Sequence, residues 1–123
     1  MIRRLDIVRG CGLGLLLVLL GACSRSAGIA EVREAVGDAP VVLLSTSSCG
    51  YCRKLRADLG HWGVDYVDID VESDRKGRRA YDLVNGRGVP ILLVGDSVLH
   101  GYWPERSRDL LVAANLISDS PAP

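Results

Sequence analysis

Residues 41–52 read Val41-Val42-Leu43-Leu44-Ser45-Thr46-Ser47-Ser48-Cys49-Gly50-Tyr51-Cys52. The apolar first half predicts a buried strand, and the polar residues after it predict a turn. Residues 51–62 then carry Tyr, Leu, Leu and Trp at helical spacing, so we expect a helix to begin at the cysteines. Two cysteines three positions apart at a helix start lie on one side of the first turn, close enough to form a small disulfide ring.

The start of this helix also predicts which cysteine reacts. The first N–H groups of a helix have no partner within the helix, and the dipole is positive there, so a thiolate on Cys49 is stabilised. Arg53, Lys54 and Arg56 add positive charge near the helix start. Cys52 is expected to be the more buried of the two thiols. The pattern indicates a redox dithiol in which Cys49 is the nucleophile and Cys52 is the resolving cysteine.

The N-terminal segment has the features of an export signal. Three arginines lie within the first nine residues, and the apolar stretch that follows is too short to span a bilayer but suits a signal sequence. Leu20-Gly21-Ala22-Cys23 resembles the bacterial lipobox, whose cysteine is lipidated before cleavage. We therefore expect residues 1–22 to be removed, Cys23 to be lipidated and residues 23–28 to form a short tether. The alternative is an ordinary signal peptide that is cut near Ala27, with Cys23 discarded.

The mature chain is expected to be one slightly acidic, monomeric domain. Removal of residues 1–22 leaves 101 residues with 12 basic against 14 acidic side chains, enough for a single compact domain. Nucleic-acid binding is not expected, because it would require a strong basic excess. Cys11 is lost with the signal, so one pair of free thiols remains. Ser24, which follows Cys23, favours the outer membrane, so the predicted location is the periplasmic side of the bacterial cell envelope.

The rest of the chain alternates between helical and strand patterns. Alternating apolar residues over 64–71 predict a strand, and Gly95-Asp96 predicts a two-residue hairpin turn between two further strands. Pro104 marks the start of the last helix. The predicted elements are a helix over 29–36, a strand over 41–45, the dithiol helix over 51–62, a strand over 64–71, a helix over 74–84, strands over 91–94 and 97–100, a helix over 104–117 and a flexible tail over 118–123. This order predicts an α/β fold in one domain, residues 29–117: a mixed four-stranded sheet, two parallel strands plus an antiparallel hairpin, with helices on both faces.

Over residues 29–117 this element order and the Cys-x-x-Cys motif resemble the thioredoxin-fold superfamily, and more closely its glutaredoxin branch, because the domain is short and Tyr51 lies inside the motif. The Cys-Gly-Tyr-Cys tetrapeptide is also similar to that of periplasmic disulfide isomerases. Gly88-Val89-Pro90 stands at the start of the third strand, where this family has a cis-proline. The resemblance implies a cis Val89–Pro90 bond, and a substrate segment that pairs with the Val89 backbone and contacts Pro90 and Tyr51.

Two positions depart from the pattern of these families. Thioredoxins have a buried acidic residue six positions before the first cysteine, where this chain has Leu43, so the sequence shows no proton acceptor for Cys52. Glutaredoxins bind glutathione partly through a glycine-rich turn near the last helix, where this chain has His100-Gly101-Tyr102-Trp103. The large rings disfavour glutathione as a partner, although the backbone of Val89 would still offer it pairing.

The predicted function is a membrane-tethered thiol-disulfide oxidoreductase that acts on protein or small-molecule disulfides in the cell envelope and needs no cofactor. Its expected partners are disulfide-containing or dithiol proteins, an envelope electron donor or acceptor, and the membrane through Cys23. A reductase or general oxidoreductase is favoured over an isomerase, because a lone domain of this length has no dimerisation segment.

Two other functions remain open at this point. The cysteine pair could be a permanent disulfide in a non-catalytic envelope lipoprotein, although so small a ring restricts little chain entropy. It could also be a copper-binding thiol module, since an exported two-thiolate site suits a soft ion. A complete metal site is not predicted, because the histidines, His61 and His100, lie far along the chain from Cys49. The basic run 75–79 is interpreted as a solvated helix face rather than a docking site for an acidic partner.

Overall fold

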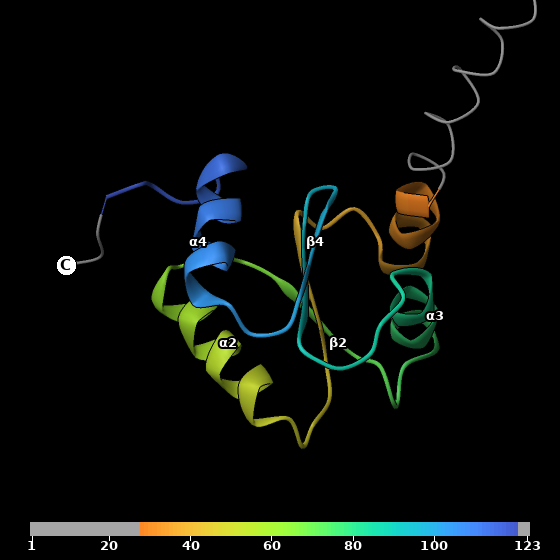
Figure 1. Cartoon of the computed structure of the whole chain (residues 1–123). Coiled ribbons are helices and arrows are strands. Elements are labelled where there is room, and N and C mark those ends of the chain that lie inside the picture. The colour runs from red at the N-terminus through yellow and green to blue at the C-terminus, as the bar shows by residue number, and fades with distance from the viewer. Residues whose placement is uncertain (1–27, 121–123) are drawn as a thin grey trace, which may run out of the picture.

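A four-stranded mixed sheet carries Cys49 and Cys52 at one of its ends (Figure 1). The computed structural model describes residues 28–120. The expected signal sequence, Cys23 and nearly all of the expected tether lie outside the described residues. The described elements are, in chain order, a helix over residues 28–36, β1 (Val41–Ser45), α2 (Gly50–His61), β2 (Val67–Asp70), α3 (Arg75–Leu83), β3 (Ile91–Val94), β4 (Ser97–His100) and α4 (Pro104–Ala113).

The sheet has the strand order β2-β1-β3-β4, which confirms the predicted architecture. β2 runs parallel to β1, with Val42 beside Val67 and Leu43 beside Asp68. β3 is antiparallel to both β1 and β4. β1 and β3 are therefore the central strands, and every residue in them is buried, as their apolar sequences predict. Parallel strands need a long crossover, here α2, so the cysteines lie where β1 passes into that helix.

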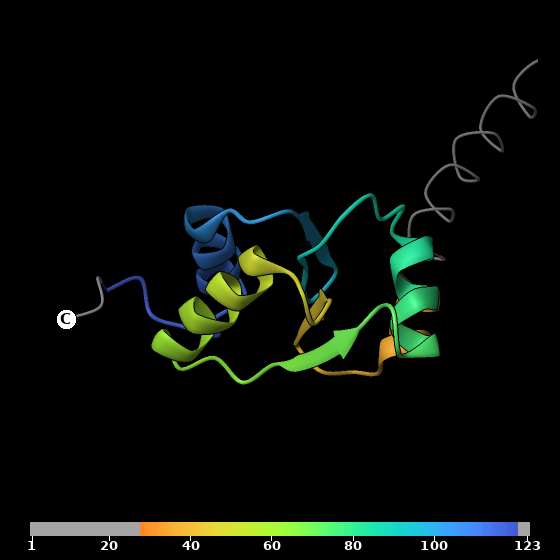
Figure 2. The ribbon, with the colours of Figure 1, turned by 90° about the horizontal axis from the view of Figure 1, so that it is seen from below.

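Helices cover both faces of the sheet (Figure 2). Because successive side chains of a strand point to opposite faces, β1 supplies residues to two cores. One core joins the first helix and α3 to the sheet, and the other joins α2 and α4 to it. The buried residues are Val32, Ala35, Val42, Leu44, Val71, Ala80, Ile91 and Leu93 in the first core, and Val41, Leu43, Leu55, Leu59, Val64, Leu92, Val94 and Leu111 in the second.

Local sequence sets the ends of several elements at the predicted residues. The turn Gly95-Asp96 joins β3 to β4, and Gly95 has the positive φ of 56° that such a turn requires. Asp74 is the N-cap of α3, where its carboxylate accepts the backbone N–H groups of Lys76 and Gly77. Gly37 ends the first helix with a φ of 85°.

The predicted strand over 64–71 is too long. The structure forms only the four residues of β2, because Val64 still belongs to the end of α2, where its N–H bonds a carbonyl of that helix. Ile69 and Val71 face the first core, as the alternation predicts. Val67 is nevertheless 42% exposed, since β2 is the edge strand of the sheet.

The last helix also ends earlier than predicted, at Ala113 instead of residue 117. Asn115 adopts a left-handed φ of 57°, and the N–H of Leu116 bonds the carbonyl of Leu111 at 2.9 Å. This is the hydrogen-bond pattern of a Schellman helix end. Asparagine tolerates the left-handed conformation better than most residues, so Asn115 acts here as glycine often does.

The two ends of the described chain have distinct places in the fold. The first helix, drawn in orange in Figure 1, begins toward the upper end of the picture, and the turn that leads from β1 into α2 lies at the lower end of the sheet. Toward the other terminus, Arg108 donates to the carbonyls of Ser118 (3.3 Å) and Ser120 (2.6 Å), so this part of the predicted flexible tail contacts α4. Over residues 28–120, no helix has the length and apolarity needed to cross a bilayer.

Candidate active site

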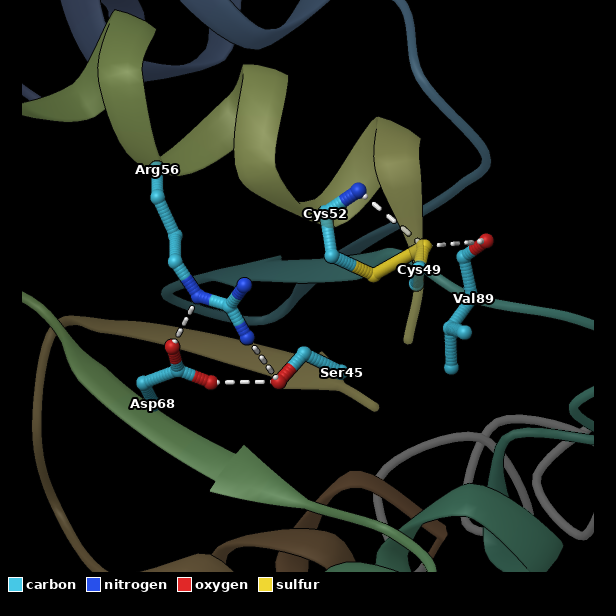
Figure 3. The surroundings of a disulfide bond; sticks show 6 residues. All are labelled: Ser45, Cys49, Cys52, Arg56, Asp68 and Val89. Atoms are coloured by element: carbon cyan, nitrogen blue, oxygen red, sulfur yellow. Dashed lines mark hydrogen bonds and ion pairs between the residues drawn. A yellow bond between two sulfur atoms is a disulfide. The ribbon is translucent and has the colours of Figure 1, made fainter. Parts of the chain in front are cut away.

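Cys49 and Cys52 form a disulfide at the start of α2 (Figure 3). Their Cα atoms are 5.2 Å apart, within the usual range for disulfides. Cys49 is the N-cap residue of the helix, and its Sγ accepts the backbone N–H of Cys52 at 3.0 Å. Cys52 is fully buried, whereas Cys49 is partly exposed. The reachable sulfur is therefore also the one that the helix N-terminus would stabilise as a thiolate.

The Val89–Pro90 peptide bond is cis, as the resemblance implies. Pro90 is fully buried, and its carbonyl accepts the N–H of Gly101 at 2.9 Å. The carbonyl oxygen of Val89 lies 3.7 Å from the Cys49 Sγ, although 40 positions separate the two residues. Figure 3 shows the two groups facing each other. The structure thus brings the predicted proline segment directly beside the reachable sulfur.

Tyr51, another predicted substrate contact, points outward from the motif. Its side chain is 58% exposed, so Cys52 takes the place on the buried face of α2 that the helical spacing suggested for Tyr51. The Tyr51 ring stacks on Tyr102 with centroids 5.6 Å apart. The Lys54 Nζ lies 5.2 Å from the centre of the Tyr51 ring. The motif is therefore flanked by an aromatic pair with one associated cation.

Tyr102 is fixed by a hydrogen bond that the sequence did not predict. Its hydroxyl donates to the Asp58 Oδ2 at 2.7 Å, and the two residues are 44 positions apart. This hydrogen bond, followed by desolvation and by the charges of Asp58 and Glu105, raises the pKa of Tyr102 to about 12. The bond holds the ring of Tyr102 where it can stack on Tyr51.

Spectrophotometric titration of the four tyrosines should find one that ionises late, near pH 12. In Asp58→Asn the charged acceptor is gone, so this ionisation should move down toward the ordinary value of about 10. A raised pKa in the folded state favours the neutral phenol. The stability that this bond contributes is therefore complete below about pH 10 and is lost as the pH rises toward about 12. Asp96→Asn, at the hairpin turn, is the matched control, and an Asp58→Asn curve that overlays the wild type would contradict the assignment.

A closed group of hydrogen bonds next to the disulfide joins Ser45, Arg56 and Asp68 (Figure 3). The Ser45 Oγ donates to the Asp68 Oδ1 at 2.5 Å, and the Arg56 Nε donates to the Asp68 Oδ2 at 2.5 Å. The Arg56 Nη2 completes the group by donating to the Ser45 Oγ at 2.9 Å. The hydrogen bond to Asp68 is the main reason why the pKa of Arg56 is raised. Ser45 is 1% exposed, so part of this group is buried beneath α2.

A carboxylate of this group lies on the strand next to position 43. Leu43 is fully buried in the apolar core below α2. In the parallel register Asp68 lies beside Leu43, so an acidic side chain comes from the neighbouring strand instead. In the predicted strand over 64–71 Asp68 alternates with apolar residues, but nothing in the sequence paired it with Ser45 or Arg56. Of the three predicted cations, Lys54 contacts Tyr51 and only Arg56 joins this group.

The remaining sequence candidates come from other parts of the fold. His61 lies in the last turn of α2, and His100 is the last residue of β4. Within residues 28–120, no group of three or more His, Cys, Asp or Glu side chains is placed to hold a metal ion. The basic side chains of the run 75–79 are exposed on α3, on the opposite face of the sheet from α2.

Comparisons with known proteins agree with this geometry. A sequence model of the glutaredoxin family matches residues 41–99. An uncharacterized glutaredoxin-like 8.6 kDa protein in a rubredoxin operon of Clostridium pasteurianum is 29% identical over 63 residues, which cover 50% of this chain and 84% of that protein. The buckwheat glutaredoxin-glutathione complex superposes with a TM-score of 0.59 at 21% identity, covering 76% of this chain and 96% of that chain. Reduced glutaredoxin C1 from Populus tremula x tremuloides gives 0.58 at 21% identity, covering 82% and 96%.

The structural neighbours share the fold at low sequence identity. The match to the family model runs from β1 through α2 and the proline segment to most of the β3–β4 hairpin. The family match includes the Cys49–Cys52 disulfide at the start of the crossover helix. The chain is accordingly a glutaredoxin-like protein with the thioredoxin fold, a module of the thiol-disulfide oxidoreductase type.

Proposed function

We propose that this protein is a thiol-disulfide oxidoreductase of the bacterial cell envelope, held at its membrane by a lipid on Cys23. The redox part of the proposal rests on the difference between the two sulfurs. Cys49 is partly exposed and its Sγ receives an N–H group at the helix start, whereas Cys52 is fully buried. A disulfide with one reachable sulfur can be opened by an outside thiolate and closed again by the buried thiol. A purely structural disulfide needs no such difference.

The proposed reaction moves two electrons between the cysteine pair and a substrate. In the reduced protein the Cys49 thiolate attacks a substrate disulfide, a mixed disulfide forms, and the first substrate sulfur leaves as a thiolate. Cys52 then attacks the Cys49 Sγ, which releases the second substrate sulfur and forms the Cys49–Cys52 disulfide. The two thiol protons of the protein end on the two substrate sulfurs. The same steps in reverse oxidise a substrate dithiol.

The proposed substrate is an extended protein segment that carries a disulfide or a dithiol. The backbone of Val89, whose carbonyl lies 3.7 Å from the Cys49 Sγ, supports pairing with such a segment as with an added strand. Pro90 and the exposed ring of Tyr51 would line the same approach. The stack of Tyr51 on Tyr102 argues against glutathione as the usual partner. An envelope electron donor or acceptor would return the pair to its working state.

The reduction potential of the pair tests the redox proposal. The full chain carrying Cys11→Ser and Cys23→Ser, called here the two-cysteine protein, would be equilibrated with dithiothreitol buffers, and its free thiols counted. We expect a potential between about −270 and −120 mV, the range of thiol-disulfide catalysts. A value well below about −300 mV would instead indicate a permanent structural disulfide. Reduction of insulin disulfides, with the variant that also lacks Cys49 as the control, gives an independent readout.

The lipid anchor is proposed from the sequence Leu20-Gly21-Ala22-Cys23, and the outer membrane from Ser24. Bacteria that express the full chain would be fed a radioactive fatty acid and then fractionated. The wild type should carry the label in the outer-membrane fraction, and Cys23→Ala should carry none. A wild-type protein without label would refute the anchor and leave the redox proposal intact.

A further inference from the structure

Arg56 lies about one helical turn after Cys52 on α2. Side chains four positions apart on a helix have Cβ atoms about 5–6 Å apart. Figure 3 shows the Arg56 side chain folded beneath the helix, with its guanidinium group between Cys52 and Asp68. Lys54, by contrast, extends over the Tyr51 ring on the exposed side. The charge of Arg56 is therefore directed toward the buried cysteine.

The guanidinium group of Arg56 is held in this position. Its Nε and Nη2 donate to Asp68 and Ser45 at 2.5 and 2.9 Å, and Ser45 is itself bonded to Asp68. Fixing an arginine side chain costs rotamer entropy, and an isolated surface ion pair seldom offsets that cost. A closed group of three bonds from three elements, one of its members 1% exposed, is a defined structure rather than a chance surface pair.

The need for a fixed cation follows from the burial of Cys52. The thiolate is the attacking form of a cysteine, and Cys52 is fully buried. Burial removes a sulfur from water and so disfavours its ionisation. A nearby positive charge offsets this effect. Resting on the proposed function, we infer that Arg56, positioned by Asp68 and Ser45, favours the Cys52 thiolate and so speeds the step that resolves the mixed disulfide.

Arg56 and Asp68 should have opposite effects on this step. Figure 3 shows the Arg56 guanidinium group between Cys52 and Asp68, so we expect its positive charge to have the larger effect on the Cys52 thiolate. Asp68 orients Arg56 but also neutralises part of its charge. Asparagine at position 68 keeps an oxygen acceptor for the Arg56 Nε and removes the negative charge. A purely structural role for the group would instead make both substitutions harmful in the same way.

Release of thionitrobenzoate from 5,5′-dithiobis(2-nitrobenzoate) separates the two steps. In the reduced two-cysteine protein, attack by Cys49 releases the first thionitrobenzoate and leaves the second as a mixed disulfide. Attack by Cys52 on the Cys49 Sγ then releases the second. Stopped-flow absorbance therefore reports the nucleophilic phase and the resolving phase of the same sample.

Arg56→Gln should slow the resolving phase about three- to tenfold, because a less stable thiolate is rarer but intrinsically more nucleophilic. The first phase should stay within about twofold of the wild type. Arg56→Lys, which keeps the charge, should recover most of the rate. Asp68→Asn should speed the resolving phase about two- to threefold. Arg79→Gln, an exposed arginine of α3 on the opposite face of the sheet, is the matched control and should change neither phase.

The inference is overturned if Arg56→Gln resolves the mixed disulfide at the wild-type rate, or if Asp68→Asn slows resolution as much as Arg56→Gln does. A wild-type protein that shows only the first phase would overturn the proposed function itself. If both phases are observed and the rate of the resolving phase does not change in Arg56→Gln, the inference is overturned and the proposed function is not. Urea unfolding of each variant verifies that all of them are folded under the conditions of the assay.

Discussion

The Cys52→Ser variant is expected to hold its substrate as a mixed disulfide on Cys49 and to lose turnover by roughly a thousandfold or more. Serine removes the sulfur that must attack the Cys49 Sγ, but it leaves Cys49 partly exposed at the helix start. The first half of the reaction therefore proceeds and the second half does not. Insulin or a disulfide-bonded peptide, incubated with the reduced variant without glutathione, should appear as a covalent complex on a non-reducing gel and by mass spectrometry.

Cys49→Ser is the matched variant and should capture nothing. When both variants are made in the two-cysteine protein, the remaining thiol of Cys49→Ser is Cys52, which is fully buried and cannot reach a substrate disulfide. Both substitutions are small, so circular dichroism should show the same fold for each. Covalent capture by Cys49→Ser with none by Cys52→Ser would reverse the assignment of the two roles. Equal turnover by Cys52→Ser and the wild type would rule out the two-cysteine mechanism.

Gly77→Ala is expected to destabilise the domain by about 1–2 kcal/mol. A glycine-to-alanine change inside an open helix gains up to about 1 kcal/mol. At Gly77, however, the new Cβ would lie 2.6 Å from the Ile69 Cγ2 and 2.9 Å from the Asp70 carbonyl oxygen. Backbone and strand must move to admit it, and such overpacking costs about 1–3 kcal/mol. The steric cost exceeds the gain, so the midpoint of urea unfolding should fall.

Gly60→Ala supplies the control for this comparison. Gly60 lies in α2, is exposed, and an added Cβ there meets nothing within 4 Å. The same substitution should therefore raise the free energy of unfolding by a few tenths to about 1 kcal/mol. The packing of α3 on β2 would have to be looser than described here if Gly77→Ala stabilised the protein as Gly60→Ala does.

The parts of the fold that follow from local chemistry could be predicted closely. Gly95-Asp96 sets both ends of the hairpin because the turn needs a residue that accepts a positive φ. Asp74 starts α3 because its carboxylate caps the free N–H groups. The continuous apolar runs of β1 and β3 identify the central strands. The order of these elements was enough to predict the sheet and the dithiol helix within it.

Features that depend on distant partners could not be predicted in this way. β2 is short because a hydrogen bond keeps Val64 at the end of α2. The sequence of residues 64–71 nevertheless alternates as that of a longer strand would. Helical spacing continued to residue 117, but Asn115 turned the chain out of the helix first. Both outcomes depend on competition between local patterns and tertiary hydrogen bonds, which spacing alone does not rank.

The same distinction between local and distant determinants applies to the candidate site. The cysteine pair and the proline segment were found from motifs, because their chemistry lies in the residues themselves. The polar neighbours were not, since the register of β1 against β2 decides that Asp68 lies near Ser45, and the fold decides that Tyr102 reaches Asp58. At Leu43 the sequence shows no proton acceptor for Cys52, and only the fold places the carboxylate of Asp68 beside that position, on the adjacent strand.

The start of the first helix and the dithiol turn lie toward opposite ends of the domain (Figure 1), and this separation determines where a tethered protein could work. The five residues of β1 alone span about 17 Å. In a domain anchored through its N-terminal side, this length would separate the sulfurs from the membrane. The sulfurs would then face the aqueous space. Substrate proteins would then approach from solution and not along the lipid surface. The size of the domain itself would set the distance from the membrane at which it can react with them.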